Sequence, residues 1–175
     1  MARRITEAEV EQLYREYGTP EHVIGHCREV TRVALGIAEH LNRHGYHLDQ
    51  ELIKGAGLSH DVARVQDEHW NVGAEILRGK GFCEEAEIVK SHMFYQFNAL
   101  DRLNECDMVC LGDRLVKYDK YVGIDERFDY IIERAPDRPG VYEHLIERRE
   151  EMRRLLNQIE DMIGVRIDTL FKQEK

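Results

Sequence analysis

Apolar residues recur every three or four positions along most of this chain, which is the spacing of an amphipathic α-helix. The clearest stretch lies between residues 20 and 45, where one helical face carries Val23, Cys27, Val30, Ala34, Ile37 and Leu41. No stretch shows the alternation of a β-strand or the turn of a hairpin. The pattern therefore predicts an all-α fold, built as a helical bundle.

Capping residues predict where the first two helices begin and end. Thr6 and Glu9 form a capping-box pattern for a first helix that ends near Gly18. Thr19-Pro20 is expected to supply the N-cap and the first-turn proline of the second helix. Gly45 is the expected end of that helix.

Further helices follow with short breaks between them. Asp49 is a plausible cap for a third helix, which runs into His60-Asp61. Helices are also expected near 69–78, 84–93 and 103–119, and another from Asp125. Pro136–Gly140 is the clearest loop, and a long charged amphipathic helix follows it between Leu145 and Met162.

That last helix has two interpretations. Its apolar residues are spaced almost as in a heptad repeat, so it is a candidate surface for a homodimer. Three heptads are the minimum for a coiled coil, and we favour a helix that covers the core of its own domain. A chain of 175 residues is long enough to bury a core without disulfides, so residues 1–175 are expected to form one domain.

The charge balance limits the possible partners. Lys and Arg number 25 against 34 Asp and Glu, a net charge of -9, which argues against binding a nucleic-acid polymer through its phosphates. A small anionic substrate would need positive charge supplied locally, by metal ions or by a few Arg and Lys. No signal peptide and no run of 18 apolar residues is present, so we expect a cytoplasmic protein without a membrane partner. The four cysteines form no C-x-x-C pair and are expected to be structural thiols.

The dipeptide His60-Asp61 places two metal-ligating side chains at the end of an apolar helix. His26 shares a helical face with Val30 and Ile37, so its ring should border the core. A neutral imidazole there needs a metal or a hydrogen-bond acceptor, and a simply hydrogen-bonded core histidine is the common outcome. The pattern alone leaves both alternatives open for His26.

Three more residues beside apolar stretches are candidate ligands, namely His69, His92 and Asp113. Asp113 follows Leu111-Gly112 and would be costly to bury without a cation or hydrogen-bond donors. Arg114 and Lys117 lie close by in the sequence, so an ion pair is the alternative to a metal.

The other histidines are given no role. His40 and His44 are four residues apart, as in some zinc-binding helices. They fall at the charged end of the second helix, however, where the exposed carbonyls favour histidine without a metal. The remaining three histidines lie in a first turn, in a loop or among charged residues; they are His22, His47 and His144.

The ordered set resembles the signature of the HD-domain superfamily of metal-dependent phosphohydrolases. His26 stands at the family's first histidine, His60-Asp61 at the doublet after an Ala-Gly-Leu segment, and Asp113 at the last aspartate. His69 and His92 resemble the two additional histidines of members that bind two metals. The resemblance covers roughly residues 20–120 and leaves a helical extension at about 125–173.

The resemblance implies a two-metal site. Asp61 would bridge the ions, with His26, His60 and Asp113 on one of them and His69 and His92 helping to hold the other. A shell of four His and two Asp suits a borderline transition metal, so iron or manganese is the first choice and cobalt, nickel or zinc are alternatives.

The implied activity is hydrolysis of a phosphate ester, of a nucleotide or another small phosphorylated molecule, by a metal-activated water. Where many members read His-Asp-Ile-Gly-Lys, this chain has His60-Asp-Val-Ala-Arg64, and Arg64 is the candidate for binding a phosphate oxygen. Lys117 is a weaker candidate, and a solvated surface lysine is the alternative. Asp61 completes the predicted catalytic set.

Two other classes share these ligands: HD-fold di-iron oxygenases, and modules that bind a metal or nucleotide without turnover. The ligands alone do not separate water activation from oxygen activation. The complete ligand set argues against a module that has lost its activity. The aromatic segment Met93–Phe97 could stack a nucleobase, although we favour core packing for it.

Overall fold

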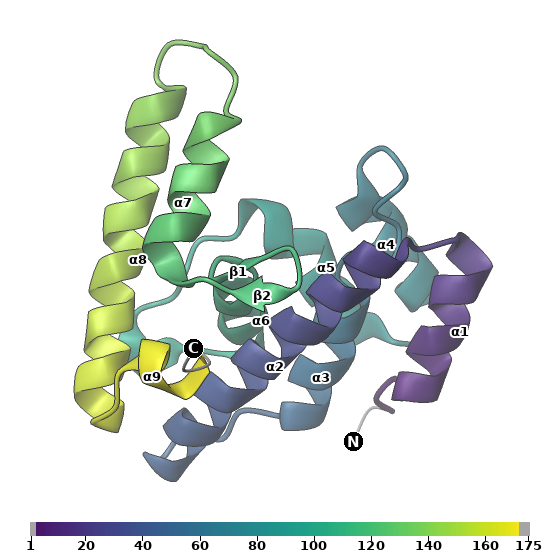
Figure 1. Ribbon diagram of the computed structural model, residues 1–175. Helices are drawn as coiled ribbons and strands as arrows, with labels where there is room; N and C mark the ends of the chain where they lie inside the picture. The colour runs from purple at the N-terminus through teal and green to yellow at the C-terminus, as the bar shows by residue number, and fades with distance from the viewer. Residues whose placement is uncertain (1–2, 172–175) are drawn as a thin grey trace.

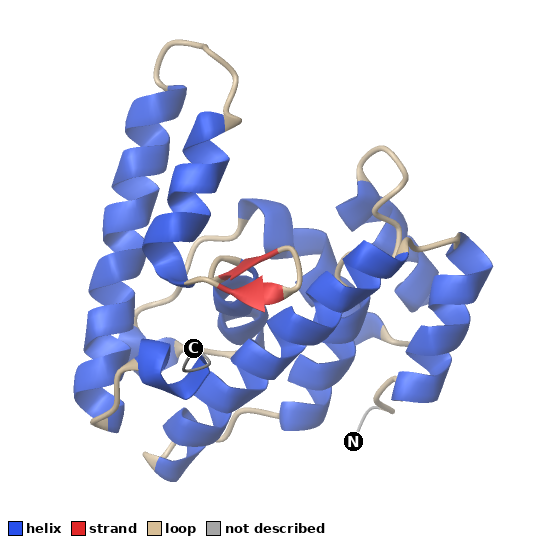
Figure 2. Cartoon of the chain, viewed as in Figure 1, coloured by secondary structure: helices blue, strands red, loops and turns tan. Residues whose placement is uncertain are grey.

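The computed structural model describes residues 3–171, and helices dominate them (Figures 1 and 2). The all-α prediction is confirmed. The α-helices are α1 (Glu7–Tyr17), α2 (Glu21–Arg43), α3 (Gln50–Ser59), α4 (His69–Gly79), α5 (Cys83–Ser91), α6 (Glu105–Asp113), α7 (Gly123–Glu133), α8 (Val141–Ile163) and α9 (Ile167–Phe171). Two 3-10 turns, η1 (His92–Phe94) and η2 (Leu100–Arg102), follow α5.

The predicted helix starts are confirmed at two of three places. Thr6 and Glu9 form the capping box of α1, and the Asp49 carboxylate accepts from the backbone amides at the start of α3. The prediction for Thr19 is wrong. Pro20 is the N-cap of α2, because its carbonyl accepts the first helical hydrogen bonds, and the Thr19 hydroxyl donates instead to the carbonyl of Val62 at 2.7 Å.

The helix predicted for 103–119 is shorter, and the expectation that no hairpin exists is wrong. Helix α6 ends at Asp113, and β1 (Val116–Lys117) then pairs antiparallel with β2 (Lys120–Tyr121). Tyr118 has a φ of 56°, the left-handed conformation that lets the chain reverse. Two-residue strands are too short to show alternation, so the apolar spacing continued the helical pattern through them.

Two glycines bring α3 and α6 close to α2. A Cβ atom on Gly57 of α3 would lie 2.6 Å from Thr31 Oγ1 of α2, and one on Gly112 of α6 would lie 2.7 Å from the carbonyl oxygen of Val30. Neither position accepts a larger side chain without separating the helices. The close contacts hold the C-terminal ends of α3 and α6 beside α2.

The main hydrophobic core joins the two halves of the chain. It contains Val30 and Ile37 of α2 and Val109 of α6, and also Ile159 of α8 and Phe171 of α9. The apolar face of α8 therefore packs against the core of its own chain. A homodimer through this helix stays a prediction.

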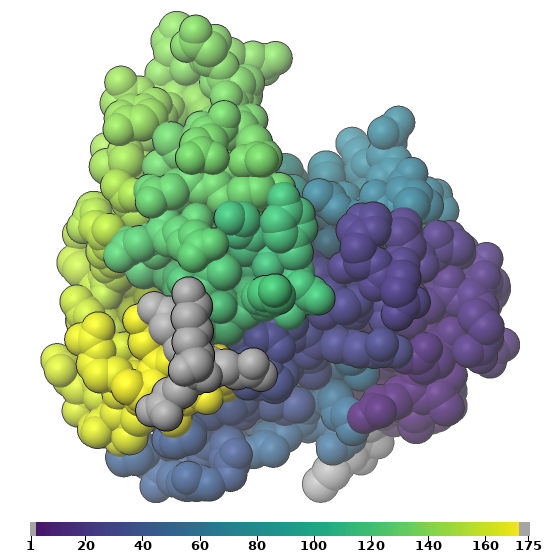
Figure 3. Space-filling view, viewed as in Figure 1, coloured from purple at the N-terminus to yellow at the C-terminus, as the bar shows by residue number. Residues whose placement is uncertain are grey.

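Helices α7 and α8 form an antiparallel hairpin that rises beside the rest of the bundle (Figure 1). In the space-filling view the surface is hollowed between this hairpin and the lobe that contains α4 and the segment before it (Figure 3). Among the described residues, no helix is both long and apolar enough to cross a membrane.

Candidate metal centre

Segments within or directly after five helices bring the six predicted ligands to one place. His26 lies in α2, and His60 and Asp61 directly follow α3. His69 is the first residue of α4, and His92 directly follows α5. Asp113 is the last residue of α6. Five of them are buried, and His26 is partly buried. Four imidazoles form a continuous chain of ring contacts, with centroids 5.2 to 5.5 Å apart, in the order His26, His60, His92, His69.

Two of the imidazoles are oriented by their own backbone. The Nδ1 of His60 lies 2.7 Å from the carbonyl oxygen of Gly57, and the Nδ1 of His92 lies 2.6 Å from that of Val89. Since a carbonyl only accepts, each Nδ1 carries the proton and each Nε2 keeps a free lone pair. The Nε2 of His60 is buried and has no hydrogen-bond partner among the described residues. A buried nitrogen lone pair without a hydrogen-bond partner can coordinate a metal ion.

Asp61 lies between two groups of possible ligands. Its Oδ1 is 3.1 Å from Nε2 of His69 and 3.6 Å from Nε2 of His92, yet makes no hydrogen bond of good geometry within the described chain. Ligand atoms of His26, His60 and Asp61 lie within 4.8 Å of one another, and so do those of Asp61, His69 and His92. The residues fit a divalent metal ion, and the Asp61 carboxylate belongs to both groups.

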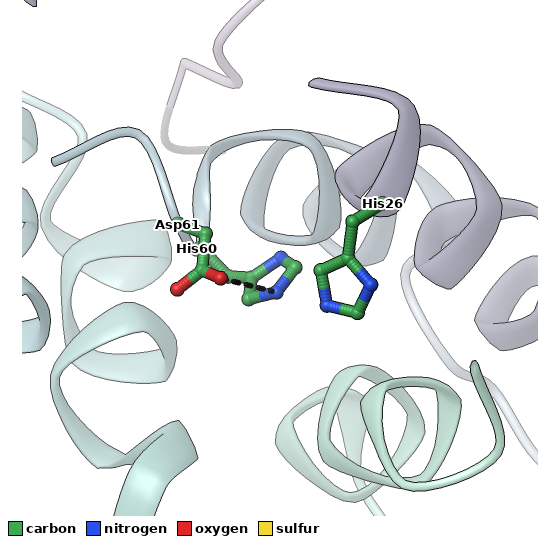
Figure 4. Close-up of side chains that lie close together, drawn as sticks. All are labelled: His26, His60 and Asp61. Atoms are coloured by element: carbon green, nitrogen blue, oxygen red, sulfur yellow. Dashed lines mark ion pairs between the residues drawn. The ribbon is translucent and has the colours of Figure 1, made fainter. Parts of the chain in front are cut away.

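Figure 4 shows how the first group is arranged, with the imidazoles of His26 and His60 turned toward each other and the Asp61 carboxylate beside the His60 ring. His26 is held from both sides. Its Nδ1 donates to the carbonyl of Tyr118 at 2.7 Å, and its Nε2 lies 3.2 Å from Oδ1 of Asp113. Tyr118 lies between β1 and β2. This β-hairpin, which the sequence did not predict, thus supplies the contact that orients His26.

Asp113 contacts His26 of the first ligand group, and two arginines lie beside its carboxylate. Arg114 forms an ion pair with its Oδ2, and Nη2 of Arg127 lies 3.7 Å from its Oδ1. Asp113 is not part of either three-residue ligand group. Both alternatives that the sequence offered for this aspartate, an ion pair and a place beside the ligands, are thus present in the structure.

The charges of the centre shift the pKa values of its members. Burial lowers the pKa of His60 to about 4, so the ring is neutral at physiological pH. Burial opposes ionisation of Asp61 and Asp113 as well, but interactions with neighbouring side chains outweigh it: the imidazoles of His60 and His69 hold the pKa of Asp61 well below its usual range, and Arg114 and His26 do so for Asp113. Neutral imidazole and ionised carboxylates are the states that bind metals.

A cleft of about 730 Å³ opens onto this centre. One wall carries His26, Asp61, His92 and Asp113, and the other consists of side chains from α7 and α8. The lining includes four arginines, Arg64, Arg114, Arg127 and Arg148. Asp61 and Asp113 are the acidic residues of the lining within the described chain.

Several residues of the lining were not found by sequence reasoning. Arg127 and Arg148 belong to amphipathic helices, where a basic residue facing a cleft has the same spacing as one facing solvent. His22 and His144, which were given no role, also line the cleft. The long amphipathic pattern after the loop at 136–140 predicted the helix, but nothing in it indicated which residues face the ligands.

The two predicted phosphate-binding residues lie in different surroundings. Arg64 lines the cleft, with Nε 3.6 Å from Oδ2 of Asp61 and Nη1 3.2 Å from the ring nitrogens of His69. Lys117 is not among the cleft residues described, and its Nζ lies 3.3 Å from Oε1 of Glu126 and 5.1 Å from the centre of the Tyr130 ring. The structure thus brings Arg64, and not Lys117, to the centre.

The aromatic segment after His92 divides between the core and the cleft. Phe97 packs against the main core, as we favoured for the segment as a whole. Phe94 does not: its side chain is 73% exposed, lines the cleft and contacts Trp70 edge to face at 5.3 Å. The prediction of core packing is wrong for Phe94, which ends the 3-10 turn that begins with the buried His92.

Comparisons with curated proteins give partial matches. An uncharacterized protein of Methanocaldococcus jannaschii is 40% identical over 72 residues, which are 39% of this chain and 43% of that protein. A tRNA (cytidine(56)-2'-O)-methyltransferase of Thermoplasma volcanium is 33% identical over 85 residues, 46% of this chain and 24% of the enzyme. The matches thus span less than half of either relative.

No solved structure matches the chain. The family comparison is more informative, because the model of the HD domain matches residues 23–118, more than half of the chain. The matched segment begins three residues before His26 and ends five residues after Asp113. Since this match covers more than half of the chain and the six candidate ligands lie close together, the chain belongs to the HD domain family.

Proposed function

We propose that this protein is a metal-dependent phosphohydrolase that cleaves a phosphate ester of a small molecule, a nucleotide being the first candidate. The observation that carries the proposal is the pair of ligand groups that share Asp61 at the edge of an arginine-lined cleft. A cleft of about 730 Å³ lies within the range of roughly 300–1,000 Å³ that is usual for small-molecule sites.

Divalent ions held there would lower the pKa of a water molecule and stabilise the negative charge that develops on the phosphate oxygens. His26 and His60 would hold one ion, His69 and His92 the other, and Asp61 both. Four imidazoles and carboxylate oxygens favour a borderline transition metal, so we propose iron or manganese. Asp113, beside His26, would complete the first ion's shell.

Arg64 is the proposed phosphate-binding residue, and its place in the cleft supports this role. It lies beside Asp61 at the mouth of the centre, and its guanidinium can donate to two phosphate oxygens at once. Its side chain is 49% exposed, so a ligand can reach it. We do not include Lys117, because its ammonium group contacts Glu126 outside the cleft.

The test is phosphate release by protein reconstituted with manganese or with iron, screened against nucleotides, phosphomonoesters and phosphodiesters. We expect release from at least one substrate, and loss of release in Asp61→Asn. Asp67→Asn is the matched control, because Asp67 is an exposed carboxylate six residues further along.

Each assay is run in air and without oxygen. Equal phosphate release in both supports hydrolysis, whereas a product that forms only with oxygen identifies an oxygenase. No product with either metal, in protein shown to contain it, contradicts the proposal and favours a binding module.

A further inference from the structure

We propose that Arg148 binds a second anionic group of the substrate, so that the molecule cleaved here carries two anionic groups, one at the metal centre and one against α8. This inference rests on the proposed function, since it names the class of substrate for the same cleft. It concerns a residue outside the matched HD domain, which ends at residue 118.

The distribution of charge in the cleft supports a ligand with more than one negative group. The chain as a whole has a net charge of -9, yet the described lining of this cleft holds four arginines against two aspartates. The aspartates are the candidate metal ligands, so bound ions would leave the cleft still more positive. A single phosphate at the metal centre would leave Arg148, on the far wall, without an anion.

Among these arginines, Arg148 has the least compensated charge. Arg114 and Arg127 both contact the carboxylate of Asp113, and Arg64 lies 3.6 Å from Asp61. Arg148 has no carboxylate within 4.0 Å in the described part of the chain, and its one described hydrogen bond is donated by Nη2 to the carbonyl of Tyr95 at 2.7 Å. That bond holds the side chain in place and leaves other N–H groups of the guanidinium available.

The surface around Arg148 suits a ligand with an organic body between its two charges. Ile131 of α7 and Leu145 of α8 line the same wall, while the exposed ring of Phe94 lies on the centre's side of the cleft. Apolar walls with a few placed polar groups are typical of small-molecule sites. A phosphorylated molecule with a second phosphate or carboxylate across its apolar part fits these walls.

Alkyl bisphosphonates test the inference without depending on turnover, because a hydrolase does not cleave their carbon–phosphorus bonds. Binding of ethane-, butane- and hexane-bisphosphonate to the manganese-reconstituted protein is measured by calorimetry, each against the alkyl monophosphonate of equal length. We expect at least one bisphosphonate to bind about tenfold more tightly than its monophosphonate, the effect of one charge-assisted hydrogen bond.

Arg148→Gln should remove this gain and leave the affinity for the monophosphonates unchanged. The matched control is Arg154→Gln, which removes the same charge from an exposed position of the same helix, outside the lining described for the cleft. Because both variants keep the metal ligands, chelation of the metals by a bisphosphonate affects them equally.

Equal affinities in the wild-type protein, no binding of any bisphosphonate, or a gain that survives in Arg148→Gln would each overturn the inference. The proposed function can fail separately. Phosphate release without a preference for bisphosphonates refutes only the role of Arg148, whereas a preference that depends on Arg148, in a protein that releases no phosphate, refutes only the hydrolase.

Discussion

Arg127 lies with its Nη2 3.7 Å from Oδ1 of Asp113, and its Nε also donates to the backbone carbonyl of Asp113 at 3.4 Å. This pair joins α7, which follows the matched HD domain, to the residue that ends α6 within it. The position of the α7–α8 hairpin is thereby coupled to a candidate metal ligand. The wall of the cleft that α7 and α8 form is thus attached to the candidate metal centre through Asp113.

Replacing Arg127 should loosen the hairpin. In Arg127→Gln we expect faster amide hydrogen exchange in α7 and in the first half of α8, because both contacts with Asp113 are lost, while α2 and α3 keep their protection. Arg138→Gln, an exposed position in the loop between α7 and α8, is the control. Unchanged exchange in α7 would show that core packing alone holds the hairpin.

The number of metal ions bound per chain should depend on which of the two ligand groups is intact. We expect His92→Ala to retain about one of two ions per chain and Asp61→Ala to retain neither, because Asp61 belongs to both groups and His92 to one. Elemental analysis of the purified, reconstituted proteins measures this. His47→Ala removes an exposed histidine and should keep the wild-type content. Equal losses in Asp61→Ala and His92→Ala would refute the bridging role.

The contact between α2 and α3 should be sensitive to a single methyl group. Gly57→Ala forces a Cβ into the space of Thr31 Oγ1, and we expect it to lower the free energy of unfolding by about 1–3 kcal/mol. Gly79→Ala is the matched control, since nothing lies within 4 Å of a Cβ at that position of α4. Urea denaturation compares them, and equal stabilities would mean that α3 shifts at little cost.

Asp49 should contribute to stability in a pH-dependent way. Burial opposes its ionisation, but hydrogen bonds from the Leu52 amide and the Arg4 side chain outweigh this and lower its pKa below the ordinary value. Its contribution is therefore complete above the pKa of the unfolded chain, roughly 3.9, and is lost as the pH falls through the folded value.

At neutral pH we expect Asp49→Ala to cost about 1 kcal/mol of unfolding free energy, the usual effect of losing an N-cap. The cost should shrink when thermal unfolding is repeated at successively lower pH. Asp49→Asn keeps a capping side chain without the charge, so its stability difference from Asp49→Ala should not change over the same range. A cost for Asp49→Ala that is constant with pH would show that the charge adds nothing.

The features that the sequence predicted are those with short-range causes. The capping box at Thr6 and the cap at Asp49 are local arrangements of side chain and backbone, and their residue patterns were sufficient. The candidate ligands were singled out because they stand beside apolar helical stretches, and the resemblance to the HD-domain superfamily then joined them into one set. The helix end at Asp113 was not predicted, because the apolar spacing continues beyond it.

The features that it missed depend on tertiary contacts. Thr19 has the residue type of an N-cap, but its hydroxyl bonds to Val62, 43 residues away. The reversal at Tyr118 and the exposure of Phe94 depend on how segments pack, which periodicity does not record. The cleft arginines of α7 and α8 were hidden for the same reason, since only the folded hairpin distinguishes Arg148 from Arg154.

The hydrogen bonds from Nδ1 of His60 and His92 have a consequence for assembly. Each acceptor is a carbonyl three residues earlier in the same segment, so helix formation itself sets the ring tautomer and direction. These two imidazoles are therefore already oriented without a bound ion, so metal binding would require little further ordering of either ring. The centre is preorganised at these two positions.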